Sequence, residues 1–160
     1  MTTRLQHVIR RHGLVIASIM TALVIVVPAA ASGAQVTRGT FHEFAVGAAQ
    51  GMDINGHAQM IRTGSGRTIV SIHVEGLASN TTYGSQVPKQ ACAVGEADGH
   101  YQYVPGAGVN DINEIWPGFT TNDSGIGNGN ARNDGIAAST AVSVVVHAPG
   151  GAKIACADLE

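Results

Sequence analysis

The sequence predicts an all-β domain, an antiparallel sandwich or barrel of short strands joined by long loops. Three observations favour this class. Apolar and polar residues alternate in several short segments, and alternation with a period of two indicates strands with one buried face. Glycine occupies 21 of the 160 positions and supplies tight turns. Charged residues make up only 12% of the chain, about half the usual quarter, and no segment after residue 34 has a helical period.

The clearest predicted strand covers residues 68–77. Its apolar side chains Val70, Ile72 and Val74 share one face, which we expect to point into the core. His73 lies on the opposite face, where a structural or solvent-exposed role is favoured over a catalytic one.

Further strands are expected before and after this segment. Residues 57–61 join it through the Gly64-Ser65-Gly66 turn, and residues 141–147 and 152–156 form a hairpin across Pro149-Gly150-Gly151. Shorter or weaker candidates are residues 40–44, 115–121 and 127–131. Residues 93–113 are rich in Gly, Asp, Asn and Pro and predict a long central loop, a feature that often carries function.

Residues 1–34 have the pattern of a secretory signal peptide. Arg4, Arg10 and Arg11 precede the apolar run at residues 13–27, and small residues follow it. Cleavage after residue 31 or after residue 34 fits the pattern, and an uncleaved membrane anchor is the alternative. The prediction is therefore export to the cell envelope or the exterior, no membrane attachment after cleavage, and one domain over residues 35–160.

The charge and the cysteines of the exported part restrict the function further. It holds six basic against eleven acidic residues, which excludes the basic surface that nucleic-acid binding requires. Cys92 and Cys156 are its two cysteines, and an exported chain permits a disulfide between them. Two buried free thiols are the alternative.

Several segments of the last ninety residues together resemble one known family, the copper/zinc superoxide dismutases, and specifically the short, divergent, secreted bacterial members. The segments are HVEGLASNTTYG (73–84), Cys92, GHYQ (99–102), NEIWPGFTTNDSGIGNGNA (113–131), SVVVH (143–147) and GAKIACADL (151–159). The resemblance implies a Greek-key β-barrel or sandwich of about eight antiparallel strands and a disulfide between Cys92 and Cys156.

The metal site that the resemblance implies is only partly present. His100 and His147 match two of the family's four copper ligands. The other two positions, a His-x-His pair in the family, hold Gln86 and Pro88, and neither is a good copper ligand. The family's active-site arginine corresponds to Lys153, which keeps the positive charge without the planar fork of donors.

The zinc site that the resemblance implies is weaker still. The family places its remaining zinc ligands in the loop after His100, and residues 101–116 contain no histidine. Asp98 and Asp111 are nearby carboxylates, but loop acids of this kind are usually solvated. Zinc is therefore not expected.

We therefore expect a superoxide-dismutase-like domain with a degenerate metal site, which binds copper weakly and is not a competent dismutase. One alternative is an active copper-dependent enzyme that acts on superoxide with His42 or His57 as substitute ligands. The other is a purely structural β domain that binds no metal.

Overall fold

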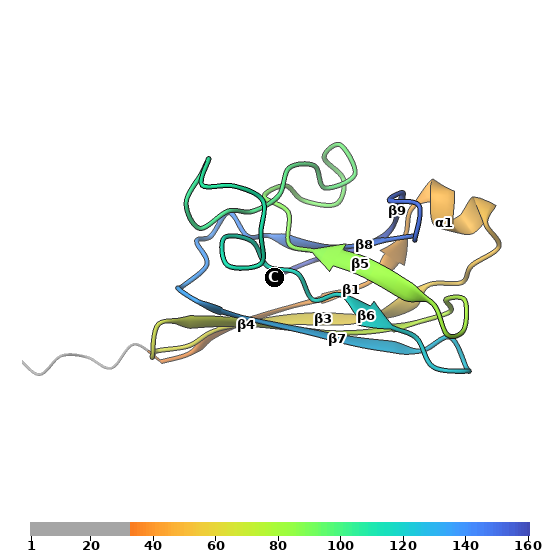
Figure 1. Cartoon of the computed structure of the whole chain (residues 1–160), viewed down its shortest axis with the longest axis horizontal. Helices are drawn as coiled ribbons and strands as arrows, with labels where there is room; N and C mark the ends of the chain where they lie inside the picture. Colours follow the sequence, from red (N-terminus) through yellow and green to blue (C-terminus); the bar gives the residue numbers. More distant parts are fainter. Residues whose placement is uncertain (1–32) are drawn as a thin grey trace, which may run out of the picture. The chain divides into compact units, whose positions relative to one another are not determined.

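A computed structural model describes residues 33–160, in which two antiparallel sheets pack face to face (Figure 1). The first sheet has the order β1 (Gln35–Thr40), β3 (Asn55–Arg62), β4 (Arg67–Glu75), β7 (Gly127–Asp134). The second has the order β2 (His42–Glu43), β9 (Lys153–Asp158), β8 (Ser143–His147), β5 (Thr82–Gln86), β6 (Phe119–Thr120). The all-β prediction is confirmed, with nine strands in the described residues.

The sandwich form is confirmed, whereas the barrel form of the prediction is not, because the two sheets stay separate. At one edge, Arg38 of β1 and Glu160 exchange two backbone hydrogen bonds of 2.9 Å. The pairing goes no further, so it does not close the sheets into a barrel.

The core lies between the sheets and follows from the alternation within the strands. Val70, Ile72 and Val74 of β4 are buried as predicted, and His73 lies on the outer face. The second sheet supplies Val144, Val146 and Ile154, all fully buried. Burial of these β-branched side chains is the main favourable contribution to folding.

Both predicted hairpins are confirmed. β3 pairs with β4 across the Gly64-Ser65-Gly66 turn, where the Thr63 amide donates to the Arg67 carbonyl at 2.8 Å. β8 pairs with β9, with a register shift between Val146 and His147 at the end of the ladder. The β3–β4 and β8–β9 hairpins provide one strand pair to each sheet.

The first predicted strand, residues 40–44, is wrong in its bounds. In the structure β1 ends at Thr40, and the two-residue β2 lies within the predicted range. The buried Phe41 lies between them, where the chain passes from one sheet to the other. The short helix α1 (Ala45–Ala49) follows and was not expected. A helix of five residues is too short to show a period, and this one has no side-chain cap.

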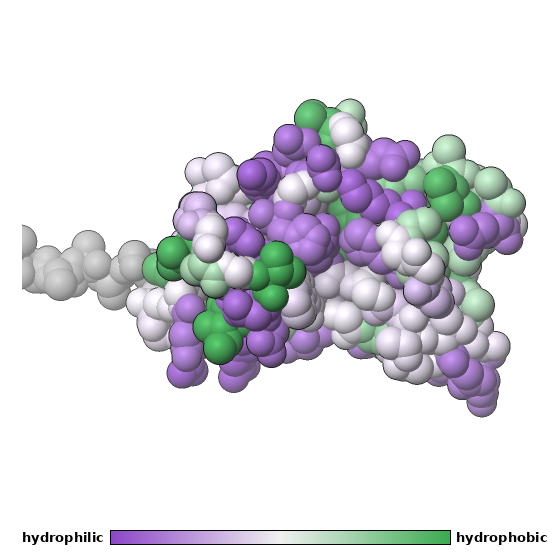
Figure 2. All heavy atoms as spheres, turned by 45° about the horizontal axis from the view of Figure 1, so that its top comes forward, coloured by the Kyte–Doolittle hydropathy of each residue, from purple (hydrophilic) through white to green (hydrophobic). Residues whose placement is uncertain are grey.

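The predicted central loop is confirmed and extends over residues 87–118, between β5 and β6. It lies over the five-stranded sheet (Figure 1). The predicted strand 115–121 is reduced to β6, and predicted strand 127–131 lies within the longer β7. Val104, Val109 and Ile112 of the loop are exposed, and Figure 2 shows that apolar residues on this face form small groups within a mainly hydrophilic surface.

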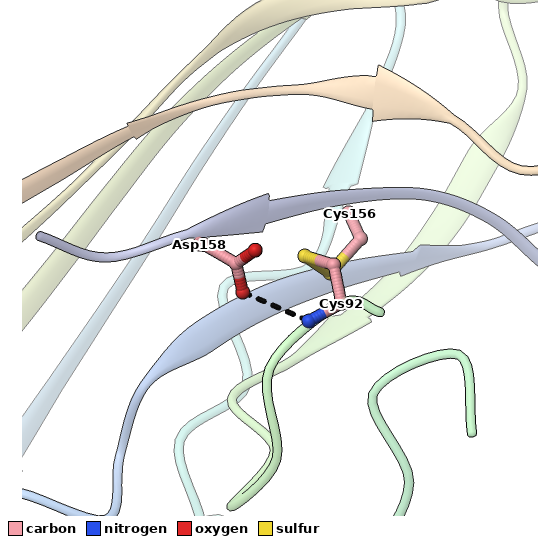
Figure 3. A group of neighbouring side chains, drawn as sticks. All are labelled: Cys92, Cys156 and Asp158. Atoms are coloured by element: carbon pink, nitrogen blue, oxygen red, sulfur yellow. Dashed lines mark hydrogen bonds between the residues drawn. A yellow bond between two sulfur atoms is a disulfide. The ribbon is translucent and has the colours of Figure 1, made fainter. Parts of the chain in front are cut away.

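A disulfide between Cys92 and Cys156 joins the central loop to β9, as the sequence predicts (Figure 3). Both residues are buried. The carboxylate of Asp158 accepts a hydrogen bond of 2.8 Å from the Cys92 amide, which adds a second attachment at the same point.

Residues 1–32 lie outside the described residues. The predicted signal peptide at residues 1–34 therefore stays a prediction. Between residues 33 and 160, no helix is long and apolar enough to cross a bilayer.

Candidate metal-binding pocket

An open pocket of about 270 Å³ brings together three of the residues that the sequence analysis selected. It lies where β5, β8 and the central loop meet. The residues that line it are Gly84, Ser85, Gln86, His100, Trp116 and His147. His100 and His147, 47 positions apart in the printed sequence, thus face one cavity.

The pairing of β5 with β8 explains why His147 and Gln86 reach this pocket. Gly84 is the register partner of His147, and Gln86 is the partner of Val145. Gly84 has no side chain to fill the space, so the His147 ring has room beside it. Gln86 lies two positions further on the same side of β5 and is only 6% exposed.

His100 is oriented by a carboxylate that the sequence analysis did not select. Its Nδ1 hydrogen bonds to Oε2 of Glu114, whose side chain is almost completely buried. Trp116 Nε1 donates to the same carboxylate oxygen at 3.0 Å, and Gln102 Nε2 donates to Oε1 at 2.9 Å. An ionised carboxylate only accepts, so Nδ1 of His100 carries a proton, and in the neutral ring the lone pair is on Nε2.

The environment of Glu114 favours its ionised form. Burial alone would raise the pKa of this carboxyl group, but the hydrogen bonds from Gln102, His100 and Trp116 outweigh it, so the pKa lies below its usual value. A fixed negative charge therefore stands behind His100 at neutral pH.

His147 is oriented in a similar way by the backbone. Its Nδ1 lies 3.1 Å from the carbonyl oxygen of Gly151, which can only accept a hydrogen bond. Nδ1 therefore donates, and the lone pair of the neutral ring is on Nε2. Both retained histidines thus have their Nδ1 atoms engaged and their Nε2 atoms available as donors to a metal.

Pro88 and Lys153 are placed differently from the three residues above. Pro88 forms an isolated bridge with His100 and is not among the lining residues, and its ring has no donor atom for a metal. Lys153 also lies outside the lining. Its Nζ is 3.6 Å from a carboxylate oxygen of Asp98 and 3.4 Å from the carbonyl oxygen of Gly95, so its charge is partly compensated.

The donors present do not fit a zinc ion beside His100. Nδ1 of His100 is hydrogen bonded to Glu114 and is not free to bind such an ion. Elsewhere between residues 33 and 160, one cluster brings three residues of metal-binding types within 4.8 Å: Cys92, Cys156 and Asp158 (Figure 3). Its two sulfur atoms are bonded to each other, so they are not the thiolates that zinc requires.

The proposed substitute ligands do not line the pocket. His42 is the register partner of Cys156 at the edge of the second sheet. His57 lies on β3, in the other sheet, and stacks on His73 with ring centroids 5.3 Å apart. The side-chain oxygen and imidazole nitrogen donors that line the pocket therefore come from His100, His147, Gln86 and Ser85.

Sequence reasoning missed two residues here: Trp116, which lines the pocket, and Glu114, which hydrogen bonds to His100 from behind the lining. They flank Ile115, which is fully buried, so the two side chains alternate away from it. A carboxylate beside an apolar residue is ordinary alternation in an all-β chain, so no local signal in the sequence identifies Glu114.

No protein-family model matches the chain, and no curated protein matches it. Solved structures do match. A variant of superoxide dismutase 5 from Candida albicans is 14% identical, with a TM-score of 0.56 over 80% of this chain and 92% of that one. The copper(II) form of the same protein is 15% identical, with a TM-score of 0.55 over 78% and 90%.

At this level of identity the likeness concerns the fold alone. The expected resemblance to bacterial members in particular finds no support, since these neighbours are fungal. Residues 33–160 therefore have the β-sandwich fold of the copper/zinc superoxide dismutases.

Proposed function

We propose that this chain is a secreted or cell-envelope superoxide-dismutase-like domain that binds copper weakly at His100 and His147 and is not a competent dismutase. The observation that carries the proposal is the composition of the pocket. Two imidazoles line it with Gln86, and the position two residues further holds Pro88. Half of the ligand set of the family is thus replaced by residues that bind copper poorly.

The retained residues still favour an interaction with a metal. Glu114 and the Gly151 carbonyl hold the two rings with Nδ1 as the donor, which leaves each Nε2 free to bind. A carboxylate behind a histidine also increases the basicity of the ring and favours cation binding. Because of these contacts, we expect the pocket to bind copper more tightly than two isolated surface histidines would.

Dismutation makes a stricter demand on the same pocket. Copper, when bound, supplies one-electron chemistry with superoxide, and this needs retention of the ion in both oxidation states. Gln86 offers one amide oxygen, a harder donor than copper normally selects, and Pro88 offers none. Lys153, which would attract a small anion, is next to the Asp98 carboxylate instead of in the pocket lining. These placements support binding without turnover.

Copper titration followed by a superoxide assay on the full chain tests the proposal. We expect saturable copper binding that is weaker in His100→Ala and in His147→Ala, no zinc binding, and no superoxide turnover above free copper. His57→Ala is the matched control and should bind copper as the parent does. Stoichiometric tight copper with fast turnover would contradict the proposal, and binding lost in His57→Ala would support the substitute-ligand alternative.

A further inference from the structure

A second pocket, of about 510 Å³, lies on the outer face of the four-stranded sheet. The central loop lies on the side of the other, five-stranded sheet (Figure 1). Strands β5 and β8 of that sheet contribute residues to the candidate metal-binding pocket. Six of the polar side chains in its lining are those of Arg38, His57, Gln59, Ser71, His73 and Asn128. Its volume is in the range of small-molecule sites in proteins.

Strand register places these polar side chains in two rows across the sheet. His57 of β3 lies opposite His73 of β4, and His73 lies opposite Asn128 of β7. Two residues along the strands, Arg38 of β1 lies opposite Gln59, and Gln59 lies opposite Ser71. Neighbouring strands are about 4.8 Å apart, so the rows form a continuous array of hydrogen-bonding groups.

Arg38 gives this array a positive charge. The guanidinium group donates to the side-chain oxygen of Gln59 from Nη2 at 2.8 Å and from Nε at 3.1 Å, with the amide oriented to accept. Within residues 33–160, Arg38 makes no ion pair with a carboxylate. A neutral amide leaves the charge of Arg38 uncompensated, so an anionic group from a ligand would be attracted here.

The histidines add a flat surface and no net negative charge. His73 hydrogen bonds to Asn128 through Nδ1 at 2.9 Å and to Glu75 through Nε2 at 2.8 Å. These two acceptors raise the pKa of His73, with the Asn128 hydrogen bond as the largest cause. Because both ring nitrogens are already bonded, His73 is a poor metal ligand. His57 stacks on the His73 ring at an interplanar angle of 29°.

We propose that this pocket binds a hydroxyl-rich ligand with one carboxylate, of the uronic acid class. The carboxylate pairs with the guanidinium group of Arg38, and the hydroxyl groups exchange hydrogen bonds with the amides and the hydroxyl of Gln59, Asn128 and Ser71. One uncompensated cation among several neutral polar groups matches a monoanion with several hydroxyls. This inference does not depend on the proposed copper site.

An NMR titration of the full chain with sodium glucuronate tests this inference. Glucose, which lacks the carboxylate, and acetate, which lacks the hydroxyls, are the comparison ligands. We expect saturable shifts at Arg38, His57 and His73, with glucuronate binding at least about tenfold more tightly than either comparison ligand, a difference of about 1.4 kcal/mol.

Two arginine substitutions make the test specific. Arg38→Gln should lower glucuronate affinity by about tenfold or more. Arg132→Gln is the matched control, because Arg132 is exposed on the neighbouring strand β7 and does not line the pocket. Equal affinity for glucose and glucuronate, acetate binding as tight as glucuronate, no saturation, or an equal loss in both variants would overturn the proposal.

Discussion

The imidazole of His100 hydrogen bonds through Nδ1 to the buried carboxylate of Glu114. This pair connects the two ends of the irregular segment between them. It also determines the tautomer of His100, because the ionised carboxylate can only accept. The candidate metal-binding pocket therefore keeps an oriented ring even though two of its expected ligand positions hold other residues.

Replacement of Glu114 by glutamine should change both stability and its dependence on pH. The folded-state pKa of Glu114 lies below the ordinary 4.5. Its ionised form therefore stabilises the fold above pH 4.5, and this contribution is lost as the pH falls toward the folded-state pKa. We expect Glu114→Gln to be less stable by about 1–3 kcal/mol at neutral pH and to lack this part of the acid-induced decline.

Urea unfolding measured from neutral pH down to about pH 3 gives both quantities. Glu96→Gln, at an exposed position in the same loop, is the control and should follow the parent. An unchanged acid decline in Glu114→Gln would show that the Glu114 carboxylate is not a source of pH-dependent stability.

The pKa of His73 depends on Asn128. The hydrogen bond to Asn128 is the largest contribution that raises this pKa above 6.5, and the bond to Glu75 is the next. Because the folded-state pKa is raised, the stabilisation is fully present below pH 6.5 and is lost as the pH rises through the folded-state value. Asn128→Ala should move the pKa of His73 toward 6.5, as measured by NMR titration of the ring.

Asn130→Ala provides the comparison for this titration. Asn130 lies on the same strand and bonds to Ser71 Oγ at 2.9 Å instead of to His73. If both alanine variants shift the His73 titration equally, the assignment of the effect to Asn128 is wrong.

The disulfide should provide a large share of the stability of this domain. Cys92 and Cys156 are 64 positions apart. In the chain-entropy model, a bridge that closes a loop of this length stabilises the fold by about 4 kcal/mol. The double variant Cys92→Ala with Cys156→Ala should lose about that amount in urea unfolding, and reduction of the parent should have a similar effect. Equal unfolding midpoints for the oxidised and reduced parent would contradict this.

Arg62 should stabilise the fold although no carboxylate of residues 33–160 pairs with it. Its buried guanidinium donates to the carbonyl oxygens of Ala137 at 2.8 Å, Ala141 at 3.1 Å and Ala138 at 3.3 Å. Arg62→Met removes these bonds and leaves carbonyl groups unpaired, so we expect a loss of about 1.5–3 kcal/mol.

Thermal or urea unfolding measures the loss of stability in Arg62→Met, and Arg67→Met is the comparison variant. The Arg67–Asp134 ion pair is exposed on both sides, so its loss should cost about 0–1 kcal/mol. Equal losses in the two variants would contradict the role assigned to burial of Arg62.

Local sequence patterns predict the strands with one buried face and fail where no such pattern exists. The alternation around Val70 in β4 and the β-branched run of β8 both identify strands, because burial imposes a period of two. The division between β1 and β2 at Phe41 depends on how the two sheets pack. The helix α1 is made of small residues that carry no period.

The candidate site also has residues that the sequence predicts and residues that it does not. The resemblance selects His100, His147 and Gln86, and the structure brings these three together. The partner of His100 is Glu114, which is set by the path of a loop without regular structure, and a period or spacing argument cannot follow such a path. Lys153 is selected by its position relative to Cys156, but its contact with Asp98 depends on the same loop.

Restoring the two replaced positions tests the central claim most directly. The measurement is copper affinity, by competition with a chelator of known affinity, for the parent and for the double variant Gln86→His with Pro88→His. We expect the double variant to bind copper more than about 100-fold more tightly, since even the loss of a hydrogen-bond partner behind a metal ligand costs about 10–100-fold. An unchanged affinity would contradict the claim that residues 86 and 88 are what limits copper binding in this pocket.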